Sequence, residues 1–177
     1  MRPFRILCAA LLLLLPSMAL AHGPVRQKVS VAVDVAASPA EAWAVIGDFQ
    51  DMSWLPPVFD TTGEGGNEPG ATRLLTLGDS DGPVVAETLR RYSADKMSYS
   101  YLITDVDVAV LPVTNYSSTL TVTPNDGGGA HIEWKGAFYR GYPNNDPPAE
   151  LNDEAAVAAV TGLYETGLAA LAEKLDQ

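Results

Sequence analysis

The sequence predicts an α+β domain in which a curved antiparallel sheet of six or seven strands wraps around one long C-terminal helix, with two short helices after the first strand. Two observations lead to this prediction. From Val58 to Phe138 the chain alternates between strand-like segments and turns rich in Gly, Asn and Asp. From about Leu151 to Leu175 apolar residues recur at spacings of three and four, which is typical of an amphipathic helix of about six turns.

The first segment, residues 1–21, is typical of a cleavable signal peptide. Arg2 and Arg5 precede the apolar run Ile6 to Leu15, and Ala19-Leu20-Ala21 has the small residues that signal peptidase requires. The run is about half the length of a membrane-spanning helix, so we expect no span after cleavage. The sequence therefore predicts an exported, periplasmic protein whose single domain covers residues 22–177.

The predicted mature chain has no cysteine and only two histidines. Cys8 lies in the signal peptide, which leaves no disulfide and no thiolate nucleophile. His22 would be the mature N-terminus and His131 falls on the polar face of a strand. Two histidines without cysteine argue against a conventional zinc site. We expect no metal and no cofactor.

The overall charge is strongly acidic. There are 22 Asp and Glu against 11 Lys and Arg, a formal net charge of −11. Phosphate contacts need clustered cations, so this charge argues against a nucleic-acid or general polyanion partner. The acidity is explained either by the solubility of an exported protein or by steering toward a cationic patch on a redox partner.

The N-terminal part predicts one strand and two short helices. Gln27 to Ala36 alternates valines with polar residues, which is typical of a half-buried strand. Ser38-Pro39-Ala40-Glu41 is a capping box that starts the first helix. A second short helix is expected around Asp51 to Trp54, stopped by Pro56-Pro57.

The middle of the chain predicts an antiparallel meander. The strand-like segments, which are separated by turns, include residues 71–77, 84–92, 97–103, 115–123 and 130–138. One helix cannot cover such a sheet completely, so a cleft is expected between sheet and helix. Five aromatic residues either line that cleft as a ligand site or simply fill it. They are Trp54, Tyr99, Tyr101, Phe138 and Tyr164.

This order of elements resembles the START-like SRPBCC superfamily of polyketide cyclases/dehydrases and lipid-transport proteins. The segment "DVAASPAEAWAVIGDFQDMSWLPPV" is similar to that superfamily's first strand and helix pair. The resemblance covers nearly the whole mature chain. It implies the helix-grip fold, also called Bet v 1-like, and implies little about function.

A narrower resemblance is to MxaD-type periplasmic proteins. It is carried by "ITDVDVAVLPVTNYSSTLTV" at 103–122 and "WKGAFYRGYPNNDPPAELNDEAAVAAVTGLYETGL" at 134–168. That group accompanies quinoprotein (PQQ) methanol or alcohol dehydrogenases and their cytochrome c acceptors. The resemblance implies a non-catalytic accessory role that assists the interaction of dehydrogenase and cytochrome c, and it carries over no catalytic residue.

The stretch from Tyr139 to Pro148 is the expected docking element. Tyr and Arg are favoured at interfaces, and a proline-stiffened loop loses little entropy on docking. The alternative is a structural connection that caps the final helix. The partner-binding residues expected here are Tyr139, Arg140, Tyr142, Asn144, Asn145 and Asp146.

Two other functions stay open beside the accessory role. One is a carrier of a small apolar ligand in the cleft. The other is a cyclase-like enzyme, which requires a buried ionisable group in the cleft with a shifted pKa. Asp34, Glu87 and Arg90 lie on strands, and we expect all three to face solvent, as charges on antiparallel sheets usually do.

Overall fold

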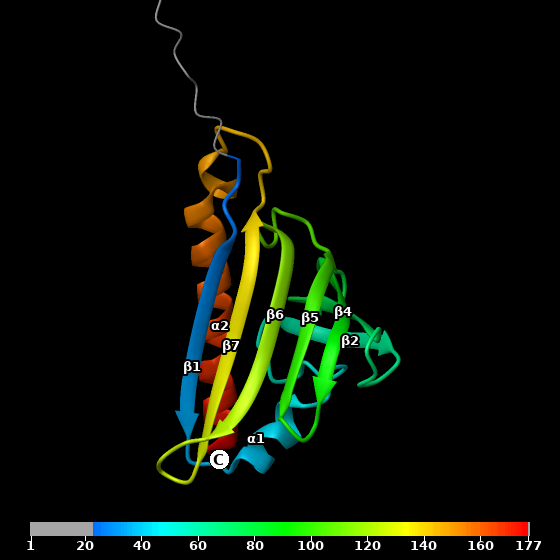
Figure 1. Ribbon diagram of the computed structural model, residues 1–177. Helices are drawn as coiled ribbons and strands as arrows, with labels where there is room; N and C mark the ends of the chain where they lie inside the picture. The colour runs from blue at the N-terminus through cyan, green and yellow to red at the C-terminus, as the bar shows by residue number, and fades with distance from the viewer. Residues whose placement is uncertain (1–22, 177) are drawn as a thin grey trace, which may run out of the picture.

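The computed structural model describes residues 23–176, so the predicted signal peptide and His22 lie outside the described residues. Seven strands form one antiparallel sheet in the order β1-β7-β6-β5-β4-β3-β2, and the long helix α2 lies along one face of it (Figure 1). The elements are β1 (Gln27–Val35), α1 (Pro39–Ile46), β2 (Val58–Glu64), β3 (Thr72–Leu77), β4 (Val84–Ser93), β5 (Ser98–Asp105), β6 (Val113–Pro124), β7 (Ala130–Arg140), a 3₁₀ turn (Ala149–Leu151) and α2 (Asp153–Leu175).

The predicted fold class is confirmed, with one difference. A single short helix, α1, follows β1, where two were expected. The stretch around Asp51 to Trp54 is a series of turns, because the amides of Leu55 and Val58 bond to carbonyls only three residues earlier. Pro56-Pro57 cannot continue a helix, so the turns end there.

Both helices begin with a side-chain cap. Ser38 accepts a hydrogen bond from the Glu41 amide, and the Glu41 carboxylate accepts one from the Ser38 amide, which confirms the capping box. Asn152 caps α2 by accepting from the Ala155 amide at 2.7 Å. The connection after β7 therefore does cap the final helix.

The core lies between α2 and the face of the sheet turned toward it, which we call the inner face. α2 contacts mainly β1 and β7. Its fully or nearly fully buried residues include Val160, Tyr164, Leu168 and Leu171. Along β7 the buried positions alternate, so that Ile132, Trp134 and Phe138 lie on the inner face.

Within residues 23–176, α2 is the one helix long and apolar enough to cross a membrane. In the structure its apolar side packs on the sheet. The expectation that no span follows the signal peptide stays a prediction.

Candidate functional site

A cavity of about 250 Å³ lies between the inner face of the sheet and α2. We call it the inner cavity. Its wall consists mostly of apolar side chains. They come from β3, β4 and β5, from the turns that follow α1, and from the helix α2, which contributes Ala159 and Leu163. Val110 lines it and is also exposed, so the loop between β5 and β6 forms part of its rim. The polar lining groups belong to Glu87, Tyr101, Tyr116 and Trp134.

The inner cavity has one ionisable group of unusual burial, the carboxyl of Glu87. Arg73 on β3 and Glu87 on β4 are directly opposite each other in the sheet register. Both point to the inner face, since each alternates in phase with buried leucines or valines of its strand. Arg73 is 0% exposed and Glu87 is 4% exposed. Arg73 Nε donates to Glu87 Oε2 at 2.5 Å.

Arg73 is fixed by further contacts. Its Nη1 donates to the carbonyl of Phe49 at 2.6 Å. Its guanidinium lies 4.2 Å from the ring centre of Phe49 and 4.9 Å from that of Tyr101, within the range of cation–π attraction. Its Nη2 has no hydrogen-bond partner in residues 23–176. The arginine thus holds Glu87 in one place at the cavity wall.

The protonation of Glu87 is set by two opposing effects. Burial raises the pKa of Glu87 above its ordinary value, and the charge of Arg73 opposes that rise. Glu87 Oε1 has no hydrogen-bond partner in the described chain, and the residue lines the cavity. Glu87 is therefore available to accept a hydrogen bond, or a proton, from a molecule in the cavity.

A chain of hydrogen-bonded hydroxyl groups includes Tyr116, which lines the same cavity as Glu87. Ser118 Oγ donates to the carbonyl of Lys135 at 2.7 Å, so it can only accept from Trp134 Nε1 at 2.8 Å and from Tyr164 Oη at 3.0 Å. Tyr164 therefore donates its hydroxyl hydrogen to Ser118 and accepts a hydrogen bond from the hydroxyl of Tyr116. The direction of every hydrogen bond in this chain is therefore fixed.

Tyr101 differs from these groups because its hydroxyl hydrogen is unused. Trp134 Nε1 lies 3.2 Å from Tyr101 Oη and donates to it. Within residues 23–176 the Tyr101 hydroxyl donates no hydrogen bond, and its one side-chain hydrogen bond is this one, in which it accepts. Burial raises the pKa of Tyr101 and of Tyr116 well above the ordinary value, so both stay protonated. Tyr101 is thus a hydrogen-bond donor at the wall of the inner cavity.

The five aromatic residues proposed as cavity lining separate into two groups. Tyr101 lines the inner cavity. The others are buried in the surrounding core, for example in the stacked pair of Trp134 and Tyr164 at 4.3 Å between ring centres. The residues in this second group are Trp54, Tyr99, Phe138 and Tyr164.

The loop proposed for partner binding is supported from inside by Arg140. Only 6% of Arg140 is exposed, and its guanidinium donates to the carbonyls of Tyr142 and Asn144 and to the carboxylate of Asp153. Arg140 therefore braces the loop and is not one of its exposed contacts. Residues 143–146 are exposed, while Tyr139 and Tyr142 are half-buried.

Of the three strand charges expected to face solvent, Asp34 and Arg90 do so, and the expectation for Glu87 is wrong. His131 is also on the outer side, where its Nδ1 lies 2.9 Å from Asp34 Oδ1. In residues 23–176 no group of three or more metal-ligating side chains gathers.

The sequence interpretation missed Arg73 altogether and misplaced Glu87. A signal for both was present: each charged residue falls in phase with the apolar alternation of its strand, Arg73 with Leu75 and Glu87 with Val85 and Leu89. A charge in phase with a buried face is either paired or functional. The cavity roles of Tyr116 and Trp134 had no comparable signal, because core and cavity aromatics look alike in sequence.

Comparison with solved structures supports the fold over the length of the domain. An uncharacterised protein from Bacillus thuringiensis superposes with a TM-score of 0.70 at 28% identity, covering 84% of this chain and 98% of its own. The protein XoxI from Bacillus cereus gives 0.69 at 29% identity, covering 84% and 94%. Norcoclaurine synthase from Thalictrum flavum, in complex with dopamine and hydroxybenzaldehyde, gives 0.61 at 16% identity, covering 86% and 87%.

Because the identity to norcoclaurine synthase is only 16%, the structural similarity to it supports the helix-grip fold and nothing further. No curated protein sequence matches the chain. The sequence pattern of one family, polyketide cyclase/dehydrase and lipid transport, matches residues 26–176, which is nearly the whole described domain. The chain therefore belongs to the polyketide cyclase/dehydrase and lipid transport family.

Proposed function

We propose that the protein binds a small, largely apolar molecule in the inner cavity and fixes one polar group of that molecule on Glu87 and Tyr101. The observation that carries the proposal is the Glu87 carboxyl, which is held by Arg73 at the wall of an otherwise apolar cavity. Replacing a buried ion pair by apolar residues is often neutral or stabilising by about 1–4 kcal/mol, so fold stability alone does not account for it.

The lining also restricts the ligand. The volume of about 250 Å³ is just below the roughly 300–1,000 Å³ of pockets for drug-sized ligands, which favours a molecule of one ring or a short chain. Glu87 Oε1 needs a donor and the Tyr101 hydroxyl needs an acceptor. A hydroxyl group of a phenol, an enol or an alcohol satisfies both, because its oxygen donates one hydrogen and accepts another.

Two alanines of α2 provide a matched test. Ala159 lines the inner cavity, and its neighbour Ala158 is exposed on the helix surface. Native mass spectrometry of protein purified from its own host should show a bound small molecule in the wild type and in Ala158→Phe. Ala159→Phe fills the cavity and should show the bare protein mass. A bare mass for the wild type, or equal occupancy in both variants, contradicts the proposal.

Glu87 distinguishes a carrier from an enzyme. A carrier returns its ligand unchanged, and Glu87→Gln then weakens binding without altering the chemical identity of the recovered ligand. An enzyme uses the carboxyl as a general base, for which a raised pKa suits operation near neutral pH. Conversion of the recovered ligand by the wild type but not by Glu87→Gln would assign acid–base chemistry to the site.

A second proposed role is that of a periplasmic accessory protein in a quinoprotein methanol or alcohol dehydrogenase system. It is favoured by the resemblance of residues 103–122 and 134–168 to MxaD-type proteins and by the exposed, internally braced loop at 143–146. A braced loop loses little entropy when it docks. Dehydrogenase–cytochrome c turnover should rise when the protein is added at low salt. Unchanged turnover at every salt concentration contradicts this role.

A further inference from the structure

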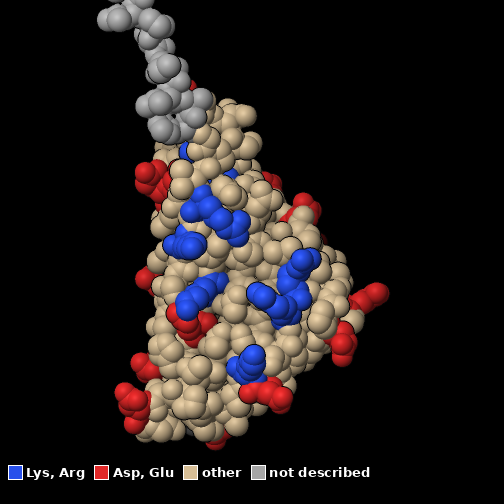
Figure 2. Space-filling view, viewed as in Figure 1, with Lys and Arg blue, Asp and Glu red and all other residues tan. Residues whose placement is uncertain are grey.

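The exposed cations of this acidic protein gather on one face. Nine of the 11 Lys and Arg lie in residues 23–176, and two of those nine, Arg73 and Arg140, are buried. Of the exposed ones, four line a hollow of about 680 Å³ on the side of the sheet turned away from α2. We call this hollow the outer basin. Figure 2 shows Lys and Arg across the middle of this face, with most Asp and Glu toward its margins.

One rim of the outer basin is built by a bulge in β4. The register passes from Leu89 opposite Tyr101 to Arg91 opposite Ser100, so Arg90 is an extra residue in the strand. Strict alternation would turn one of two consecutive arginines toward the core. The bulge instead leaves both Arg90 and Arg91 exposed, and Arg91 Nε donates to Ser100 Oγ at 3.4 Å. Neither arginine has an acidic partner within 4.0 Å in residues 23–176.

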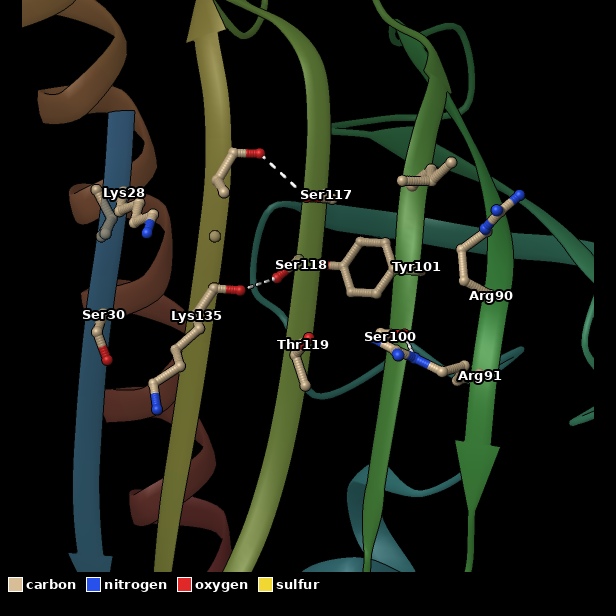
Figure 3. Close-up of a pocket in the computed structure, with 14 residues that line it drawn as sticks. Lys28, Ser30, Arg90, Arg91, Ser100, Tyr101, Ser117, Ser118, Thr119 and Lys135 are labelled. Atoms are coloured by element: carbon tan, nitrogen blue, oxygen red, sulfur yellow. Dashed lines mark hydrogen bonds between the residues drawn. The ribbon is translucent and has the colours of Figure 1, made fainter. Parts of the chain in front are cut away.

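The other rim is formed by Lys28 on β1 and Lys135 on β7, across the basin from the two arginines (Figure 3). Lys135 Nζ pairs with Glu133 at 2.6 Å, and Lys28 has no ion-pair partner in residues 23–176. Arg26, which directly precedes β1, extends this rim, and its Nη2 donates to Ser117 Oγ at 3.0 Å. Two pairs of cations thus face each other over the central strands.

The floor between the rims contains the small hydroxyl residues Ser100, Ser117 and Thr119, together with Leu102 and Ala137. The short hydroxyl side chains leave the space that the longer cations surround. Ser117 donates its hydrogen to the Ala137 carbonyl at 3.2 Å, so the donors available to a ligand are the hydroxyls of Ser100 and Thr119. None of the exposed large apolar residues of the described chain, such as Phe59 and Leu74, lines the basin. A lipid surface would be expected to engage such groups, so this composition favours a polar ligand seated in the hollow.

We propose that the outer basin binds a small ligand that carries at least two anionic groups, phosphate or carboxylate, one placed on each rim. The guanidinium forks of Arg90 and Arg91 match the oxygens of either group, and Lys28 and Lys135 supply point charges opposite. The volume of about 680 Å³ falls within the range of roughly 300–1,000 Å³ for pockets that hold a small molecule.

The position of the cations changes what the net charge implies about anionic ligands. A formal charge of −11 argues against polyanion binding only if the cations are dispersed. In the structure the outer basin is locally basic, and the acidic remainder of the surface repels anions elsewhere. A small anion is therefore directed to one place.

The test is calorimetric titration of the protein with inorganic tripolyphosphate and, in parallel, with citrate at low ionic strength. We expect saturable binding of at least one of them, with one ligand per chain. The variants Arg90→Gln/Arg91→Gln and Lys28→Gln/Lys135→Gln each remove two charges from one rim. Each should weaken binding by about tenfold or more, because a bridging ligand needs both rims.

The control Lys96→Gln/Lys174→Gln removes the same charge from positions outside the basin lining and should change affinity by less than about twofold at moderate salt. Three results would overturn the proposal: no saturable binding of either anion, equal weakening by the control, or weakening from only one rim. Binding to phosphatidylglycerol vesicles without binding of either small anion would also overturn it and assign the face to a membrane surface.

Discussion

Replacing Arg73 with Leu removes one partner of the buried ion pair and leaves the Glu87 carboxyl alone at the cavity wall. Arg73 is 0% exposed and its Nε lies 2.5 Å from Glu87 Oε2, so water cannot take over its role without opening the core. The substitution also removes the hydrogen bond to the Phe49 carbonyl. We expect Arg73→Leu to lower the free energy of unfolding at neutral pH.

The size of the loss follows from the burial of both groups. Removing one member of a buried pair costs about 3–5 kcal/mol, because the remaining charge is neither solvated nor paired. The lost bond from a charged donor to the Phe49 carbonyl, worth about 1.5–3 kcal/mol, overlaps with this cost and is not added to it. A domain of ordinary stability, about 5–15 kcal/mol, still folds after such a loss, so the variant can be measured.

The loss should depend on pH. Without Arg73 the pKa of Glu87 rises further, because burial raises it and the opposing positive charge is gone. A group whose pKa is higher in the folded than in the unfolded state stabilises the fold below the unfolded-state pKa, and this stabilisation is lost as pH rises through the folded-state pKa. The deficit of Arg73→Leu should therefore be smaller at about pH 5 than at about pH 8.

Urea denaturation followed by tryptophan fluorescence at the two pH values measures the deficit. The double variant Arg73→Leu/Glu87→Leu is the control, since it removes both charges and should recover most of the lost stability. Equal deficits for Arg73→Leu at both pH values, or a double variant as unstable as the single one, would refute the interpretation of an uncompensated buried charge.

Three further substitutions test the parts of the fold that surround the site. Gly136→Ala would place its Cβ 2.3 Å from Tyr164 Oη, so we expect a loss of about 1–3 kcal/mol in urea denaturation; an unchanged midpoint would contradict this contact. Arg140→Gln should speed proteolytic cleavage within residues 143–146, since it removes the support of that loop, and unaltered cleavage would show that the bracing is unimportant. Asn152→Ala should destabilise the protein by about 1 kcal/mol in thermal denaturation, while Asn152→Asp should not.

Much of the fold could be predicted because its signals are local. The capping box at Ser38–Glu41 specifies a helix start by two reciprocal hydrogen bonds within four residues. The alternation predicted over residues 130–138 is present in β7, where Ile132, Trp134 and Phe138 are buried. The prediction of a second short helix was wrong because the segment from Asp51 to Trp54, which Pro56-Pro57 follows, is too short to propagate helical hydrogen bonds.

The site was less predictable because it depends on register and on pairing across strands. Arg73 and Glu87 meet only because β3 and β4 place them opposite each other, 14 residues apart in sequence. Charged residues on antiparallel strands usually face solvent, and this general tendency led to the wrong prediction for Glu87. The position of Glu87 in phase with the buried Val85 and Leu89 indicated the opposite. The bulge that exposes both Arg90 and Arg91 is likewise a property of the β4–β5 pairing, which the sequence of β4 alone does not reveal.

The central claim is that the inner cavity holds a hydroxyl-bearing small molecule on Glu87 and Tyr101, and a crystal structure of protein purified from its own host tests it most directly. The account predicts electron density for a molecule of about one ring in the cavity, with a polar atom within about 2.6–3.2 Å of both Glu87 and Tyr101 Oη. A cavity closed by rearranged side chains, or filled only by water with Glu87 turned away, would contradict it.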